Sequence, residues 1–160
     1  MWNPGFDYLD VKLAKIFGVH RAPCIYSWVH RGTKERPGIV MGLARGGSCL
    51  GKAFKISGPN AEKTIDYLRS RELVTNVYLE KIRPIHLETG EKISAVTYIA
   101  DTMHEQYAGH LTEEQLIHQI SGAAGQSGDN ESYILDTANH LQELGIRDRL
   151  MERLASGLRG

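Results

Sequence analysis

At 160 residues the chain has the size of one compact domain with a core of its own, and we expect a single domain over residues 1–160. Lys plus Arg and Asp plus Glu each number 19, which excludes the basic field that attracts nucleic acid or an anionic membrane, so we expect a small neutral or zwitterionic partner. The apolar stretches are far shorter than the roughly 20 residues that cross a bilayer, and no export signal precedes them, so we expect a cytoplasmic protein without a membrane span.

The first fifty residues have the composition of β-structure. Residues 39–43, Ile-Val-Met-Gly-Leu, run into Gly46-Gly47-Ser48, which predicts a strand followed by a tight turn. Residues 48–56 then supply a returning strand.

A short helix is predicted next. Residues 57–60, Ser-Gly-Pro-Asn, break the strand and offer Asn60 as an N-cap. Ile65 and Leu68 then fall on one helical face, so we expect the helix over residues 61–71.

Two further β-rich runs follow this helix. They cover residues 74–79 and 93–99, and residues 88–91, Glu-Thr-Gly-Glu, lie between them. This pattern predicts a hairpin or a meander.

The C-terminal third is predicted to be helical. Residues 112–115, Thr-Glu-Glu-Gln, form a capping box that opens one helix. A second helix follows the polar loop at residues 125–130 and ends at Gly145, and a third lies near residues 147–155. Because strands come first and helices last, we expect an α+β fold built on a largely antiparallel sheet or a small barrel.

The sequence contains none of the common catalytic motifs. It has no GxSxG, P-loop, GxGxxG or HExxH, and His104 and His110 have no acidic or cysteine partner for a metal site. Cys24 and Cys49 are predicted to be small buried thiols, with one disulfide as the alternative. Residues 127–130 could bind a carboxylate through free N–H groups, or simply cap the helix that they precede.

Glu72 lies where the predicted helix meets the predicted strand. A carboxylate at this junction can be directed into a barrel mouth, where Leu73 and Val74 would disfavour its charged form and the neighbouring Arg69 and Arg71 would favour it. The alternative is an ordinary i,i+3 pair between Glu72 and Arg69 on an exposed turn.

Several ordered motifs resemble the ChaC-type glutathione-specific γ-glutamylcyclotransferases over nearly the whole chain. They are Met1-Trp2-Asn3-Pro4-Gly5-Phe6, residues 36–43 with Gly46-Gly47-Ser48-Cys49 after them, residues 67–78, and Gln106-Tyr107-Ala108-Gly109 with residues 125–133. The resemblance implies a γ-glutamylcyclotransferase-like fold, a small mixed or antiparallel β-barrel with peripheral helices. It also implies cleavage of glutathione to 5-oxoproline and cysteinylglycine.

The same resemblance assigns roles to individual residues. Glu72 occupies the place of the family's catalytic glutamate, and one carboxylate is enough to relay a proton from the attacking α-amine to the leaving amine. Tyr78, which would share strand parity with Glu72, and also Trp2 and Tyr133, are implied as substrate-binding residues, although both tyrosines could be core aromatics. We expect a monomer that binds glutathione and needs no cofactor.

The chain departs from the family in two places. Tyr-Gly-Ser-Leu precedes Met-Trp-Asn-Pro in the family, and its backbone N–H groups hold the γ-glutamyl group. Because the sequence begins at Met1, we expect the first strand and this loop to be missing and the chain to be nearly or fully inactive. Ala44 stands where relatives commonly carry Asp.

Two other functions remain open. One is a non-catalytic module that binds γ-glutamyl compounds or a protein partner. The other is a cyclotransferase that acts on other γ-glutamyl amines.

Overall fold

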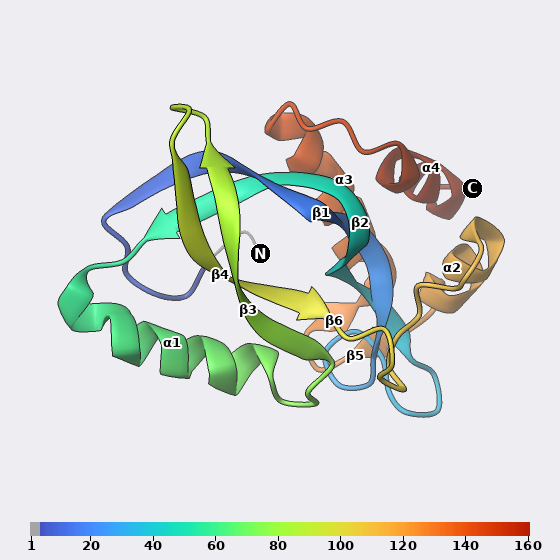
Figure 1. Ribbon diagram of the computed structural model, residues 1–160. Coiled ribbons are helices and arrows are strands. Elements are labelled where there is room, and N and C mark those ends of the chain that lie inside the picture. Colours follow the sequence, from blue (N-terminus) through green and yellow to red (C-terminus); the bar gives the residue numbers. More distant parts are fainter. Residues whose placement is uncertain (1–3) are drawn as a thin grey trace. The chain divides into compact units, whose positions relative to one another are not determined.

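The computed structural model describes residues 4–160 and contains strands and helices in the order that Figure 1 labels. Two compact units are distinguished and are described separately: the first comprises Met1–Arg21 and Leu43–Asp101, and the second comprises Ala22–Gly42 and Thr102–Gly160. The elements are β1 (Asp10–Ser27), β2 (Gly38–Lys55), α1 (Gly58–Glu72), β3 (Tyr78–Leu87), β4 (Lys92–Ala100), α2 (Glu113–Ile120), β5 (Ala124–Gly125), β6 (Gly128–Asp129), α3 (Asn130–Glu143) and α4 (Arg149–Leu158). The α+β class is confirmed.

A four-stranded sheet has the order β2-β1-β3-β4. β3 and β4 pair antiparallel from Tyr78 opposite Ala100 to His86 opposite Lys92, so the predicted hairpin is confirmed. Its turn contains Gly90 at φ 89°, a left-handed conformation that glycine adopts without steric cost. Antiparallel pairing also joins β1 to β3, and closure of the sheet into a barrel stays a prediction.

β2 is one continuous strand, so the prediction of a tight turn at residues 46–48 is wrong. Gly46 and Gly47 lie inside β2 with φ values of 95° and 68°. Consecutive positive φ angles distort a strand locally, as in a bulge, without reversing it. The Gly46 carbonyl lies 3.0 Å from Nδ1 of His20 on β1, a hydrogen bond that accompanies the distortion.

α1 begins earlier than predicted, and its N-cap is Ser57 rather than Asn60. The Asn60 N–H donates to the Ser57 carbonyl at 3.1 Å, which places Asn60 inside the first turn. Pro59 also fits this first turn, because proline has no N–H to leave unpaired and its φ is already helical.

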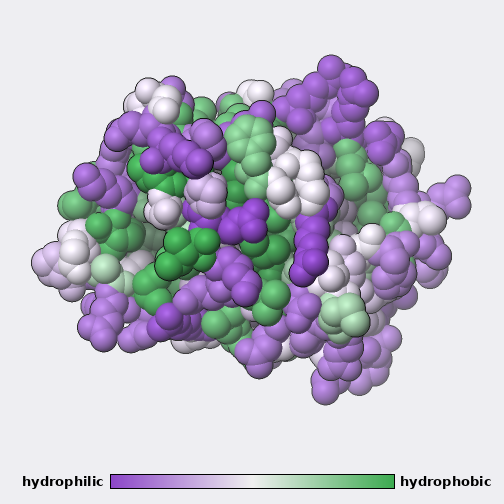
Figure 2. Space-filling view, viewed as in Figure 1, coloured by the Kyte–Doolittle hydropathy of each residue, from purple (hydrophilic) through white to green (hydrophobic). Residues whose placement is uncertain are grey.

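In the first unit, apolar residues from β1, β3 and β4 form a core. Its buried members are Ala14, Ile16, Val19, Ile85 and Ile99. The other face of the hairpin is exposed to solvent. Ile82, which pairs with Val96 across the hairpin, is 73% exposed. Figure 2 shows apolar side chains at the surface over this hairpin and beside α1.

In the second unit, α2, α3 and α4 enclose a separate core. Its buried members are Ile39, Ala108, Leu116, Ile120, Ile134, Leu141, Met151 and Leu154. The capping box at Thr112 is confirmed, since its hydroxyl accepts from the Gln115 N–H and the Gln115 side chain accepts from the Thr112 N–H. Gly145 follows α3 at φ 67°, as expected of a glycine that ends a helix. No helix within residues 4–160 is long and apolar enough to cross a membrane.

Candidate active site

Glu72 is the last residue of α1, and the chain does not pass directly from this helix into a strand. Residues 73–77 form a turn, and β3 begins only at Tyr78. Two backbone hydrogen bonds hold the turn, from Leu73 N–H to the Arg69 carbonyl and from Asn76 N–H to the Leu73 carbonyl. The predicted strand over residues 74–77, and with it the strand parity of Glu72 and Tyr78, is therefore wrong.

The Glu72 carboxylate is largely buried, with 18% of its side chain exposed. Its Oε1 accepts a hydrogen bond from Nε of Arg71 at 2.9 Å and forms an ion pair with Nη2 of the same residue at 2.9 Å. Its Oε2 accepts no hydrogen bond from any residue within the described range. One oxygen is therefore fixed and the other is available to exchange a proton.

The alternative interpretation of Glu72 and one expectation about its surroundings are both wrong. The i,i+3 pair with Arg69 does not form, because Arg69 binds the Glu80 carboxylate instead. Val74 does not desolvate Glu72, because its side chain lies 69% exposed on the turn.

Arg71 joins Glu72 to the N-terminal segment. Its Nη1 donates to the Pro4 carbonyl at 2.9 Å and to the Tyr67 hydroxyl at 3.2 Å. Its guanidinium also lies 5.3 Å from the centre of the Tyr67 ring, within the range of a cation–π contact. The side chain that pairs with Glu72 is thus held by several contacts besides that pair.

A second polar cluster lies beside Glu72 on the hairpin. Arg69 donates to both oxygens of Glu80, at 3.0 and 2.8 Å, and the Tyr98 hydroxyl donates to Glu80 Oε2 at 3.1 Å. The hydrogen bond from Arg69 lowers the pKa of Glu80 below its usual value. Burial raises the pKa of Tyr98 to about 12, with added contributions from Glu80 and, more weakly, from the charge of Glu72. Tyr98 is therefore a protonated hydroxyl near the candidate base.

Glu80 and Tyr98 were not predicted from the sequence, although a signal for them exists. A hairpin that turns around Thr89 and Gly90 places residues 80 and 98 opposite each other, as the register of β3 and β4 shows. Facing side chains in an antiparallel pair lie within contact distance. A carboxylate and a tyrosine at these two positions could have been paired on that basis.

The other predicted site residues lie in different places. Tyr78 is half-buried at the start of β3, in the same unit as Glu72. Tyr133 belongs to α3 of the second unit, where its hydroxyl accepts from the Met41 N–H at 3.1 Å and Arg31 lies over its ring. Trp2 lies outside the described residues.

The loop at residues 127–130 is a helix cap. Asp129 accepts from the Ser132 N–H at 2.7 Å, which lowers the pKa of its carboxyl. The N–H groups of Ser127 and Asn130 donate to the carbonyls of His30 and Ala123. Two of the N–H groups proposed for carboxylate binding therefore already donate to backbone carbonyls outside the loop.

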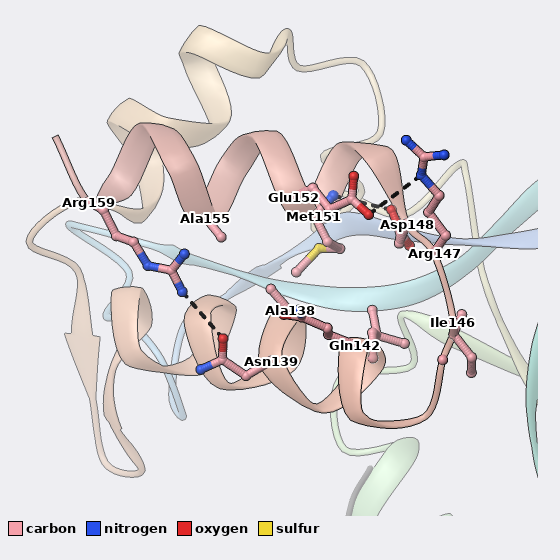
Figure 3. Close-up of a pocket in the computed structure, with 12 residues that line it drawn as sticks. Ala138, Asn139, Gln142, Ile146, Arg147, Asp148, Met151, Glu152, Ala155 and Arg159 are labelled. Carbon is pink, nitrogen blue, oxygen red and sulfur yellow. Dashed lines mark hydrogen bonds and ion pairs between the residues drawn. The ribbon is translucent and has the colours of Figure 1, made fainter.

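The second unit contains a pocket between α3 and α4 with a volume of about 390 Å³. Figure 3 shows that its polar side chains interact mainly with one another, Arg159 with Asn139 and Arg147 with Glu152. None of the predicted site residues lines it. Within residues 4–160, no cluster of His, Cys, Asp or Glu has the arrangement of a metal site.

Comparison with known proteins identifies the chain's relatives. The Escherichia coli glutathione-specific γ-glutamylcyclotransferase is 29% identical over 148 residues, which cover 92% of this chain and 64% of that protein. The human glutathione-specific γ-glutamylcyclotransferase 1 is 30% identical over 149 residues, which cover 91% of this chain and 67% of the human protein. The chain thus spans slightly less than two thirds of the length of the bacterial relative.

The fold is also that of a solved yeast protein. The crystal structure of a γ-glutamylcyclotransferase specific to glutathione superposes with a TM-score of 0.84 at 20% identity, covering 95% of this chain and 88% of that chain. The profile of the ChaC-like protein family matches residues 1–159. The chain therefore belongs to the ChaC-like protein family.

Proposed function

We propose that this chain is a γ-glutamylcyclotransferase that cleaves glutathione, with Glu72 as its acid–base catalyst. The observation that carries the proposal is the Glu72 carboxylate, with Oε1 held by Arg71 and Oε2 without a partner in the described residues. The names of the bacterial and human relatives supply the substrate class. We also propose that residues 1–160 act as one domain, because the family profile matches residues 1–159.

The reaction is an intramolecular aminolysis. The free α-amine of the γ-glutamyl group attacks its own γ-carbonyl carbon, a new C–N bond closes the lactam, and the bond to the cysteinyl nitrogen breaks. Folding the glutamyl chain back on itself can supply about 7–11 kcal/mol of the barrier through orientation. No water is consumed, and the products are 5-oxoproline and cysteinylglycine.

Glu72 carries the proton between the two nitrogens. Its Oε2 accepts a proton from the attacking amine and returns it to the leaving amine, so the carboxylate ends the cycle as it began. Because Oε1 stays bound to Arg71, the side chain keeps one orientation during both transfers.

We further propose that Tyr78, Trp2 and Tyr133 contact the substrate. We also propose that the protein is a cytoplasmic monomer.

Incubation with glutathione tests this function. The proposed function requires release of 5-oxoproline, whereas the inactivity expected from the resemblance predicts none. Glu72→Gln should abolish the release without unfolding the protein. Glu62→Gln, at an exposed position of the same helix, is the control and keeps full turnover. Full turnover by Glu72→Gln would remove Glu72 from the mechanism.

Two further arms test the alternatives. Faster release from γ-glutamyl-alanine than from glutathione would indicate a cyclotransferase for other γ-glutamyl amines. Binding of glutathione without turnover would favour the non-catalytic module.

A further inference from the structure

Arg71 and Glu72 are consecutive residues at the end of α1, and this makes their pairing unusual. Neighbours at i and i+1 point to different sides of a helix and do not normally form an ion pair. Here two nitrogens of Arg71 nevertheless converge on Glu72 Oε1, each at 2.9 Å. Some other contact must turn the two side chains toward each other.

The contacts of Arg71 with residues outside the pair supply that restraint. Nη1 reaches the Pro4 carbonyl, 67 positions away in the sequence, and the hydroxyl of Tyr67 one turn earlier on the helix. The planar guanidinium presents several N–H groups in a fixed fork, so these bonds also fix the direction of the nitrogens that face Glu72. The orientation of the carboxylate therefore depends on where the segment around Pro4 lies.

The segment from Pro4 to Phe6 is itself fitted closely to α1. Gly5 has φ 75°, and a Cβ at this position would collide with the Tyr67 hydroxyl. Phe6 makes edge-to-face contacts with the rings of Tyr67 and Phe54, at centroid distances of 6.4 and 5.8 Å. The Pro4 carbonyl thus reaches Arg71 because a glycine permits the close approach and two aromatic contacts fix it.

We propose that Arg71 is a positioning residue that holds the Glu72 carboxylate in its reactive orientation and couples it to residues 4–6. The inference rests on the proposed function, because it assigns Arg71 a part in the proton relay of Glu72. Arg71 does not exchange a proton; it fixes Oε1 and leaves Oε2 free. Displacement of the segment from α1 would then misplace the carboxylate.

Kinetic constants for glutathione cleavage test the role. We expect Arg71→Met to lower kcat about 10²-fold with little change in KM, the size of loss that a misplacement of about 1 Å produces. Arg71→Lys should recover about tenfold of the lost kcat. An ammonium keeps the charge, but it lacks the planar array of N–H groups that binds Glu72 and Pro4 at once. Lys63→Met is the control, an exposed cation of the same helix, and its kcat should stay within about threefold of the unmodified protein.

A double variant separates this inference from the proposed function. If Arg71 acts through Glu72, then Arg71→Met lowers residual turnover no further in a Glu72→Gln background. Loss of turnover in Glu72→Gln with full turnover in Arg71→Met would overturn the positioning role alone. Full turnover in Glu72→Gln would overturn the proposed function as well.

Backbone NMR relaxation gives a readout that needs no turnover. We expect the order parameters of Gly5 and Phe6 to fall from about 0.85 to below about 0.6 in Arg71→Met, and to remain high in Lys63→Met. Unchanged order in Arg71→Met would show that Arg71 does not hold the segment. An equal loss in both variants would assign the effect to general destabilisation of α1 and would also reject the proposal.

Discussion

Glu80 faces Tyr98 across the β3–β4 hairpin, and the hydroxyl of Tyr98 donates to Glu80 Oε2 at 3.1 Å. Arg69 binds the same carboxylate through two nitrogens and so attaches α1 to the hairpin. This cluster lies near Glu72, whose charge contributes to the raised pKa of Tyr98. The charge of the Glu80 carboxylate therefore affects the stability of the candidate site.

The first prediction concerns acid stability. The pKa of Glu80 in the folded protein is lowered from its ordinary 4.5, so the stability that Glu80 contributes is present above pH 4.5 and is lost as pH falls through the folded value. Glu80→Gln should therefore flatten the loss of stability below pH 4.5, measured by denaturant unfolding at several pH values. The exposed Glu62→Gln should leave the profile unchanged, and an identical profile for Glu80→Gln would contradict the prediction.

The second prediction concerns Cys24 and Cys49, neither of which is in a disulfide. Burial raises the pKa of Cys24 to about 12, against an ordinary value of 9.0, whereas Cys49 is only half-buried. A thiol reagent at pH 8 should therefore modify Cys49 in the native protein and reach Cys24 only after unfolding, because the thiolate is the reactive form. Mass spectrometry of labelled peptides identifies the modified residue.

The same burial predicts an alkaline effect. The folded state holds the Cys24 proton more tightly than the unfolded state, so this group's contribution to stability is full below pH 9 and declines as pH rises toward 12. Cys24→Ala should reduce the loss of stability between pH 9 and pH 11. A loss of the same size in this variant would assign it to other groups.

The third prediction concerns Asn130, whose side chain is fully buried at the start of α3. Its Oδ1 accepts from the Ile39 N–H at 2.6 Å, and its Nδ2 donates to the Ile39 carbonyl at 2.8 Å. Asn130→Ala leaves both backbone groups of Ile39 without these partners, so we expect a loss of about 2–4 kcal/mol in the free energy of unfolding. Asn139→Ala, at an exposed position on the same helix, should change it by less than about 0.5 kcal/mol. Comparable losses in the two variants would argue against the role of the buried amide.

Local signals predicted the elements that local chemistry determines. The capping box at Thr112, the hairpin turn at Gly90 and the end of α3 at Gly145 each depend on residues within one or two turns. The interruption predicted at Gly46 and Gly47 was wrong because glycines that permit a turn also permit a distortion inside a paired strand. Which of the two forms depends on the neighbouring strand β1, and that pairing is not a local property of the sequence.

The candidate site was predictable only in part. The resemblance singled out Glu72, but the nature of the junction after it was not apparent from composition, since Val74, Thr75 and Val77 all favour strands. The structure places a turn there instead. The contact of Arg71 with Pro4 joins residues far apart in the sequence, and no spacing rule connects them.

The last prediction concerns Asn76, the only non-glycine residue within the described range with a positive φ, at 57°. Asn tolerates this left-handed conformation, whereas a β-branched residue is strained there by about 1–2 kcal/mol. Asn76→Val should therefore destabilise the turn between Glu72 and Tyr78, with an expected loss of about 1–2 kcal/mol in the free energy of unfolding, measured with denaturant.

Asn76→Gly should keep the turn and most of the stability, because glycine adopts this conformation without strain. Since the turn fixes the end of α1, we expect glutathione turnover to follow the same order, with Asn76→Gly close to the unmodified protein and Asn76→Val well below it. Equal stability and turnover for the two variants would show that the left-handed residue does not hold the Glu72 turn.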